Sequence, residues 1–405
     1  MTTDAAPLRE TGDTTMDATR REVLARRVQR VKPSGIRRFF DIAATMADVI
    51  SLGVGEPDFV TPRHICEAAI ASIDAGDTHY TSNYGTVALR EAIAHELTQR
   101  IGMTYSPTNE VLVTVGVSEA LDCALRAVVD DGDEVLCADP GYVAYEAGII
   151  LAGGEPIAVP TLAADDFAPI AANYAARVTP RTKVILLGSP NNPTGAVIAR
   201  AELEALATLA QKHDLVVISD EIYSRLVYGT EHVSIASLPN MRDRTIVLNG
   251  FSKAYAMTGW RVGYAAAPAH ILEAMLKIHQ YSIMCAPTDA QAAALAALRH
   301  GEPDVQAMVA EYARRRDLIV RGMNAIGLPT YAPKGAFYVF PSIAELGMSA
   351  DAFVEGLLQE EHVAVVPGDA FGAQGAGRIR CTYCTAYDKI EVALERIGHF
   401  VARHR

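Results

Sequence analysis

Residues 245–264 read Thr-Ile-Val-Leu-Asn-Gly-Phe-Ser-Lys-Ala-Tyr-Ala-Met-Thr-Gly-Trp-Arg-Val-Gly-Tyr, and this stretch decides which fold the sequence predicts. Its apolar start is typical of a buried strand, which an Asn-Gly pair ends. Lys253 follows at once, just past the strand end where open α/β sheets bind their ligands. A partly desolvated lysine has a lowered pKa and can form a Schiff base with a carbonyl. A solvated surface lysine is the simpler alternative. The residues at the ends of the other predicted strands must decide between these two roles.

The composition limits the function classes. At 405 residues the chain is long enough for two or three domains. The net charge of -12 argues against a nucleic-acid partner, because such proteins present a basic face. No apolar run approaches the length of a membrane span, and residues 1–19 show no signal peptide. We therefore expect a cytoplasmic protein with no membrane partner.

The six cysteines are scattered through apolar stretches, as expected for reduced, buried thiols in a cytosolic protein. Cys381 and Cys384 have CxxC spacing, but neither a second pair nor a nearby pair of histidines accompanies them. The sequence therefore predicts no metal site and no redox role for this pair.

The hydrophobic pattern predicts two domains. Within residues 62–296, short apolar runs alternate with helical stretches, which is typical of an α/β domain with a mostly parallel sheet covered on both faces. Residues 19–61 and 297–405 are expected to form a smaller α+β domain, and residues 1–18 a disordered leader. The expected strands are 49–52, 111–115, 135–138, 183–188, 215–219, 246–248 and 262–266, then 335–340, 363–366 and 378–383.

The large domain opens with clear helix signals. Thr61 is predicted as an N-cap, and Gly76 as the residue just past the helix end. Ile65 and Ile73 are expected on the buried face of this helix.

Polar residues cluster at five strand ends of the predicted sheet. At the first, Gly116, Val117 and Ser118 open a helix, where backbone N–H groups and the serine hydroxyl can cradle a phosphate. A plain N-cap role for Ser118 is the alternative. The Gly-Lys-Ser signature of a Walker loop is missing, and the glycine-rich run 372–377 does not follow a strand and open a helix, as dinucleotide binding requires.

Two more strand ends provide a ring and an amide. Tyr142 can stack on a planar ligand, or pack as an ordinary surface tyrosine. Asn192 lies between two prolines, where its amide can donate a hydrogen bond into a site, or belong to a plain turn.

The last two strand ends carry charges. Asp220 follows the run Leu-Val-Val-Ile-Ser, where a carboxylate is costly to bury unless a cation meets it. A pyridinium nitrogen would serve, and Tyr223 could reach an oxygen on the same ring; a metal ligand or a structural salt bridge is the alternative. Arg261, eight residues after Lys253, suits bidentate phosphate binding. Together these parts match the needs of pyridoxal 5'-phosphate, which we predict as the cofactor.

Three motifs then point to a family: Asn-Asn-Pro-Thr-Gly at 191–195, Ser-Asp-Glu-Ile-Tyr at 219–223, and the run from Gly-Phe-Ser-Lys to Trp-Arg-Val-Gly-Tyr at 250–264. In this order they resemble the class I, fold-type I pyridoxal-phosphate-dependent aminotransferases of the aspartate and aromatic kind. The resemblance covers about residues 33–394. It implies a large domain with a mostly parallel, seven-stranded-type sheet and a smaller α+β domain.

The resemblance implies a role for each residue on the cofactor ring. Lys253 would hold the cofactor through a Schiff base, and Asp220 would keep the ring nitrogen protonated. Tyr223 and Asn192 would bond the ring oxygen, while Tyr142 would stack on the ring.

The cofactor phosphate would be bound by residues 116–118, Ser252 and Arg261. In many relatives a phosphate-binding serine stands three residues before the lysine, but here that place is Gly250. Tyr80 resembles the tyrosine that reaches the phosphate of the neighbouring subunit, which implies a homodimer with shared active sites.

The substrate carboxylate would be clamped bidentately by a late arginine, either Arg378 or Arg380. The match of Arg-Cys-Thr-Tyr-Cys-Thr to the family's Arg-x-Ser-Tyr-Ala-Thr favours Arg380. Gly55 would let the backbone approach the same carboxylate, Asn192 would contact it, and Ile36 would lie over the pocket.

The implied reaction is a ping-pong transfer of an amino group from an aromatic or aspartate-like L-amino acid to a 2-oxo acid, expected to be 2-oxoglutarate. No arginine for a distal carboxylate stands in segment 277–287, which leaves Arg37 or Arg38 as candidates. Segments 33–38 and 277–287 also resemble a branch that includes N-acetyl-diaminopimelate aminotransferases, which is one alternative.

Two other classes stay open beside this one. A C–S lyase can use the same scaffold, because fold does not fix the reaction. A non-enzymatic regulator would join this domain to a helix-turn-helix, for which the residues before Pro33 are too few.

Overall fold

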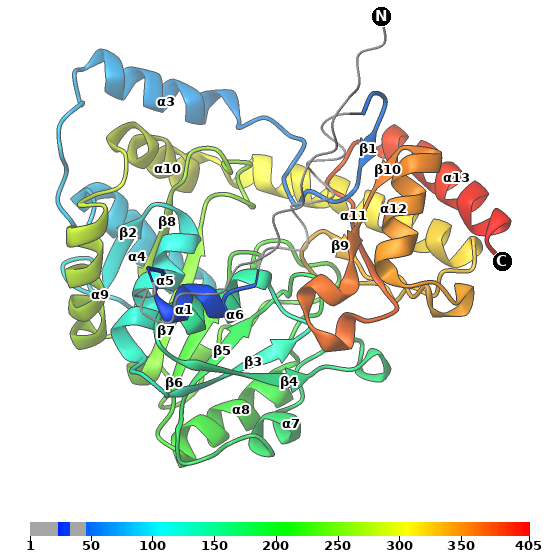
Figure 1. Cartoon of the computed structure of the whole chain (residues 1–405). Coiled ribbons are helices and arrows are strands. Elements are labelled where there is room, and N and C mark those ends of the chain that lie inside the picture. The colour runs from blue at the N-terminus through cyan, green and yellow to red at the C-terminus, as the bar shows by residue number, and fades with distance from the viewer. Residues whose placement is uncertain (1–22, 33–45) are drawn as a thin grey trace, which may run out of the picture.

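The computed structural model describes residues 23–32 and 46–405, and a seven-stranded sheet lies at its centre (Figure 1). Its strand order is β2-β8-β7-β6-β5-β3-β4, and β8 runs antiparallel to both of its neighbours while the remaining pairs are parallel. The predicted mostly parallel sheet is confirmed. The strands are β2 Val111–Thr114, β3 Glu134–Asp139, β4 Glu155–Pro160, β5 Thr182–Gly188, β6 Val216–Asp220, β7 Thr245–Gly250 and β8 Gly263–Ala266.

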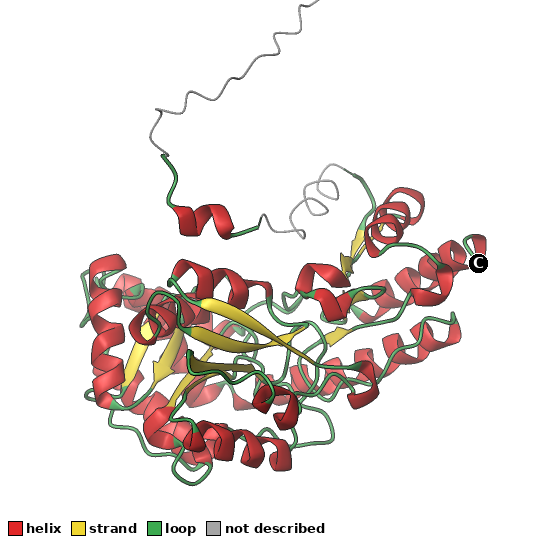
Figure 2. Ribbon diagram, turned by 60° about the horizontal axis from the view of Figure 1, so that its bottom comes forward, coloured by secondary structure: helices red, strands yellow, loops and turns green. Residues whose placement is uncertain are grey.

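Helices cover both faces of the sheet (Figure 2). Successive strand residues point to opposite faces, so Leu186 of β5 packs in one core with Leu125, and Leu187 packs in the other with Leu206. Each such buried leucine contributes about 1.5–3 kcal/mol of hydrophobic stabilisation. On the first face lie α5 Gly116–Val128, α6 Val143–Leu151 and α9 Ala269–Ser282; on the second lie α7 Ala171–Ala175 and α8 Arg200–Lys212.

A third group of helices links this sheet to the C-terminal part. Helix α10 packs against both α3 and α4, and the long α11 packs against α10, α13 and β9. Residues 288–325 thus form two helices with a break at Gly301. Their bounds are α3 Arg63–Asp74, α4 Val87–Ile101, α10 Thr288–His300 and α11 Glu302–Ala325, and the short α1 is Arg26–Arg30.

The C-terminal part has small sheets. Strands β11, β12 and β9 form an antiparallel sheet, and β1 pairs in parallel with β10, so residues near 50 lie beside residues near 363. The division into 62–296 against 19–61 and 297–405 stays a prediction, and α10 runs across its second boundary. The bounds are β1 Ile50–Ser51, β9 Tyr338–Val339, β10 Val363–Ala364, β11 Val366–Pro367, β12 Ile379–Thr382, α12 Ala350–Glu361 and α13 Tyr387–Arg403.

Short 3₁₀ helices lie between these elements. They are η1 Ala163–Asp165, η2 Ile235–Ser237, η3 Arg242–Arg244, η4 Ala344–Leu346, η5 Gly368–Phe371 and η6 Ala373–Gly375.

Two expectations for α3 were wrong. Thr61 does not cap the helix: its hydroxyl donates to the Ala256 carbonyl at 2.6 Å and accepts from the Trp260 indole at 2.9 Å. Ile73 is 53% exposed, whereas Ile65 is buried as predicted. Gly76 does lie just past the helix end, with φ +81°.

The predicted leader, residues 1–18, lies outside the described residues. Over 23–32 and 46–405, no helix combines the length and the apolarity needed to cross a membrane.

Gly250, at the end of β7, sits where β7, β8 and α5 approach closely. It pairs with Gly263 of β8, and a Cβ at position 250 would lie 2.9 Å from the Gly263 Cα and 3.2 Å from the Val117 side chain. A side chain therefore has no room there without a backbone shift.

Substitution of Gly250→Ser should lower the free energy of unfolding by about 1–3 kcal/mol, because it overpacks a backbone contact. Gly259→Ala is the matched control, since a Cβ there meets open space, and it should change stability by less than about 0.5 kcal/mol. Urea unfolding of both variants checks this. Equal free energies of unfolding for Gly250→Ser and the unsubstituted protein would contradict this prediction, because the neighbouring backbone would then accommodate the side chain without cost.

Candidate active site

A cavity of about 750 Å³ lies at the carboxyl edge of the sheet. Strands β2, β3, β5, β6 and β7 run in the same direction, so the residues that follow them meet at one edge. The predicted site residues that line the cavity are Gly55, Val117, Ser118, Tyr142, Asn192, Asp220, Tyr223, Ser252, Lys253, Arg261 and Arg380.

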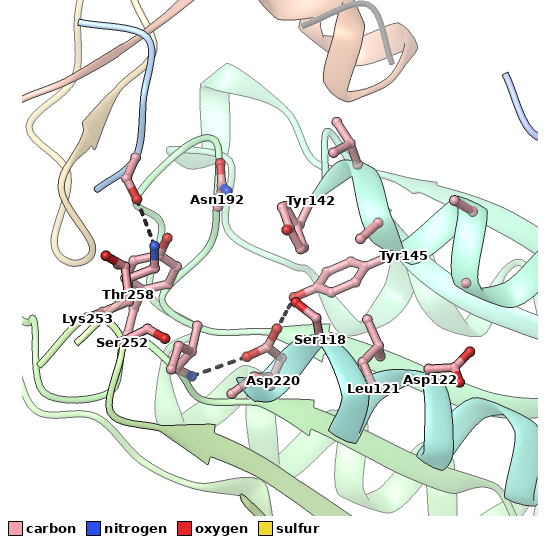
Figure 3. Close-up of a pocket in the computed structure, with 18 of the residues that line it drawn as sticks. Ser118, Leu121, Asp122, Tyr142, Tyr145, Asn192, Asp220, Ser252, Lys253 and Thr258 are labelled. Carbon is pink, nitrogen blue, oxygen red and sulfur yellow. Dashed lines mark hydrogen bonds between the residues drawn. The ribbon is translucent and has the colours of Figure 1, made fainter. Parts of the chain in front are cut away.

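Figure 3 shows Lys253, Asn192, Tyr142 and Asp220 around this space, with Ser118 on α5. The structure thus brings together side chains from all five predicted strand ends.

Lys253 is not a solvated surface lysine. Its Nζ donates a hydrogen bond to the Gly55 carbonyl at 2.7 Å, and burial lowers the pKa of the ammonium to about 8 (Figure 3). A substantial share of the amine is therefore neutral near pH 8, as a nucleophile or a general base must be.

Asp220 is buried at the end of β6. One carboxylate oxygen accepts from the Tyr145 hydroxyl at 2.9 Å and the other from the Ile222 N–H at 3.2 Å (Figure 3). Burial raises the pKa of this carboxyl to about 6. No group of three or more potential metal-ligating side chains occurs over 23–32 and 46–405, so these residues offer Asp220 no metal-ligand set.

The start of α5 brings together the residues of the predicted phosphate cradle. The helix begins at Gly116, so Ser118 lies inside its first turn and is not an N-cap. Gly116 has φ +72°, and a Cβ there would lie 2.6 Å from the Arg261 Nη2. Glycine therefore lets a guanidinium approach the helix N-terminus, where unpaired N–H groups and the helix dipole favour an anion.

Arg380, on β12, is buried beside the cavity. Its Nη1 donates to Asn192 Oδ1 at 2.9 Å and its Nη2 to the Gly53 carbonyl, whereas its buried Nε has no partner within the described part of the chain. Arg378, the other candidate, donates to the Phe340 carbonyl and does not line the cavity. The geometry therefore favours Arg380 for binding a carboxylate.

Two tyrosines of the site were missed. Tyr145 binds Asp220, and Tyr338 places its hydroxyl 2.8 Å from that of Tyr223. A Cβ on Gly55 would lie 1.9 Å from the Tyr338 hydroxyl, which explains the glycine. Tyr145 stands three residues after Tyr142, so helical spacing was a signal for it.

Three other predictions concern residues outside this set. Tyr80 is 81% exposed and does not line it. Ile36, with Arg37 and Arg38, lies outside the described residues. Cys381 and Cys384 are free, buried thiols.

The family described as aminotransferase class I and II matches residues 47–397 of this chain. The chain belongs to the class I and II aminotransferase family. It is an amino-acid aminotransferase, and this family depends on pyridoxal phosphate.

Individual relatives agree with this membership. A putative aminotransferase of Bacillus subtilis (strain 168) is 54% identical, covering 92% of this chain and 97% of its own length. An aspartate aminotransferase of Pyrococcus abyssi (strain GE5 / Orsay) is 48% identical, covering 92% and 96%. The crystal structure of an aromatic aminotransferase from Pyrococcus horikoshii OT3 is 45% identical with a TM-score of 0.87, covering 91% and 99%.

The residues of the cavity fit this aminotransferase cofactor. The cradle at Gly116 and Arg261 suits its phosphate, and the buried Asp220 suits a cationic ring nitrogen. Lys253 presents a partly neutral amine to the same space.

Asp220→Asn should change the pH dependence of the stability of the cofactor-free aminotransferase. The pKa of Asp220 is about 6 in the fold, above the ordinary value, so ionisation costs stability as pH rises through that value. The thermal midpoint of the Asn variant should therefore be close to that of the unsubstituted protein near pH 4, and above it by pH 8.

Saturation with pyridoxal phosphate supplies the control. At pH 8 the unsubstituted protein should then be the more stable one, because its carboxylate faces a cation. A difference in thermal midpoint that does not vary with pH, or that does not change when the cofactor is added, would contradict the assigned environment of Asp220.

Proposed function

We propose that this aminotransferase moves the amino group of an aromatic or an acidic L-amino acid to 2-oxoglutarate in two half-reactions. The observation that carries the proposal is the cavity itself, where a partly buried amine, a buried carboxylate and a buried guanidinium line one space. The names of two relatives, an aspartate and an aromatic-amino-acid aminotransferase, support the donor classes.

The cofactor side has a separate group for each part of the ligand. Bound pyridoxal phosphate supplies an electron sink for the bond that breaks at the amino-acid α-carbon. Asp220 would hold a proton on the ring nitrogen, and the Tyr142 ring would stack on the cofactor ring. Tyr223 and Asn192 would bond the ring oxygen. Residues 116–118, Ser252 and Arg261 would hold the phosphate, and Arg261 lies beside Gly116 at the helix N-terminus.

Lys253 carries the proton. Its neutral amine would take the α-proton of the bound amino acid and return it to the cofactor carbon, as general base and then general acid. A pKa lowered to about 8 by burial suits this double role, because both protonation states are then populated near neutral pH.

Arg380 binds and orients the substrate carboxylate. Its guanidinium is already fixed by Asn192 and by the Gly53 carbonyl, so little rotamer freedom is lost on binding. The tight packing of Gly55 on Tyr338 brings backbone close to the same place. Ile36 stays a prediction for the outer wall of the pocket.

A homodimer with shared active sites is part of this proposal. Tyr80 is 81% exposed, and Ile70 and Ile73 of α3, the helix that precedes it in the chain, are 46% and 53% exposed. A large exposed aromatic and exposed aliphatics are what a partner subunit would cover. A cytoplasmic location also stays a prediction, supported by six free thiols.

The half-reaction tests the proposed function. Aromatic and acidic L-amino acids should each bleach the visible absorbance of the bound cofactor, and 2-oxoglutarate should restore it. Lys253→Ala should abolish this cycle, lowering the rate by at least about 10³-fold because no other base replaces the amine. Lys212→Ala removes an exposed lysine at the end of α8 and is the control.

Other outcomes separate the alternatives. Preference for an N-acetylated diamino acid would favour the N-acetyl-diaminopimelate type. Release of ammonia or a thiol without a 2-oxo acid would indicate a C–S lyase and exclude the proposed transfer.

Mixed dimers test whether Tyr80 serves the neighbouring site. Lys253→Ala and Tyr80→Ala subunits, refolded together at limiting cofactor, should regain up to about a quarter of the unsubstituted activity, because half of the dimers then contain one intact site. Each variant refolded alone is the control. No gain on mixing would place Tyr80 outside the partner's site.

A further inference from the structure

Arg315 of α11 is a buried cation outside the cavity. Only 5% of it is exposed, and its Nη1 donates to Asp58 Oδ1 at 2.8 Å and to the Cys384 carbonyl at 3.2 Å. Its Nε donates to Glu311 Oε1 at 2.8 Å, and its guanidinium lies 5.0 Å from the centre of the Phe59 ring. The charge is thus compensated and hydrogen-bonded on several sides, as a buried arginine requires.

These partners belong to two chain segments that are far apart in sequence. Asp58 follows Gly55 by three residues, and Cys384 follows Arg380 by four. The Asp58 N–H also donates to the Cys384 carbonyl at 3.2 Å, so Arg315 reinforces a direct link between the segments.

Two further hydrogen bonds join the same two segments. The Cys384 thiol donates to the Glu56 carbonyl at 2.9 Å, and the Thr382 N–H donates to the Leu52 carbonyl at 2.7 Å. These links are hydrogen bonds to backbone carbonyls, whereas Arg315 adds an ion pair with Asp58 to its own hydrogen bond with the Cys384 carbonyl. The guanidinium therefore ties both segments to a third element, the long helix α11.

We propose that Arg315, acting with Asp58, is a positioning residue for the substrate carboxylate. It fixes the loop that carries Gly55 against the strand that carries Arg380. The inference rests on the proposed function, which gives Gly55 and Arg380 their roles toward that carboxylate. Bidentate binding depends on alignment, and a shift of about 1 Å can cost about 100-fold in rate.

Arg314 provides a matched control on the same helix. It also pairs with Glu311, at 2.8 and 3.0 Å, but its side chain is 56% exposed and lies over the Tyr387 ring. Arg314→Met therefore removes a neighbouring arginine and an ion pair of Glu311 without touching either segment.

Two nucleophiles isolate the carboxylate contribution in the cofactor-loaded enzyme. Aminooxyacetate and hydroxylamine attack the same cofactor carbon, but only the first carries a carboxylate. Arg315→Met should slow the reaction with aminooxyacetate about 10- to 100-fold, while hydroxylamine changes by less than about 2-fold and Arg314→Met leaves both rates unchanged within the same margin. Stopped-flow absorbance measures both rates.

If Arg315→Met does not fold, Asp58→Asn replaces it in this experiment, because the amide keeps one oxygen that can accept from Arg315 and loses the negative charge. It should lower the aminooxyacetate rate selectively but by less. In cofactor-free protein, amide hydrogen exchange over residues 53–58 should be faster in Arg315→Met than in Arg314→Met, which tests the positioning without any reaction.

Arg380→Gln separates this inference from the proposed function. This variant should lower the rate with aminooxyacetate but not the rate with hydroxylamine. If it does not, both the carboxylate-binding role of Arg380 and the inference about Arg315 are wrong. If Arg380→Gln has this effect while Arg315→Met slows both nucleophiles equally, or neither, only the inference is overturned.

Discussion

A carboxylate buried at the end of a parallel strand is the constraint on which this site depends. Asp220 is surrounded by apolar strands on both sides of β6, where an uncompensated charge costs several kcal/mol. Tyr145 and the Ile222 N–H each satisfy one oxygen, but both donors are neutral. Burial raises the pKa of this carboxyl to about 6, and a protonated ring nitrogen in the adjoining cavity would compensate its charge.

The sheet and most of the site follow from local patterns in the sequence. Asp220 ends β6 and Lys253 follows the end of β7 by three residues, so strand direction alone brings them to one edge. Strand β4 could not be predicted in the same way, because it is the edge strand and its residues are mostly half-buried, beginning with Glu-Pro. The two-residue strands β9, β10 and β11 overlap the predicted strands 335–340 and 363–366, but their bounds could not be predicted because strands this short show no period.

Contacts between distant segments could not be predicted from the sequence. Thr61 has the composition of an N-cap, yet its hydroxyl joins Trp260, almost two hundred positions away. Tyr338 stands in an apolar run that predicts a strand, and nothing local indicates that its hydroxyl meets Tyr223. Gly250, the one departure from the family's phosphate-site serine, is explained only by the approach of Gly263.

The site is built in two halves that meet across the cavity. In the proposed function, residues 116–261 provide the cofactor side, and the loop at Gly55 together with Arg380 provides the carboxylate side. In the protein as described, Lys253 donates to Gly55 and Arg380 donates to Asn192, so each half already binds the other. A substrate carboxylate and the cofactor must compete with these hydrogen bonds. Because the donors are held in place beforehand, binding would exchange hydrogen-bond partners at little cost in rotamer entropy, so the proposed function makes the rate sensitive to the alignment of the two halves.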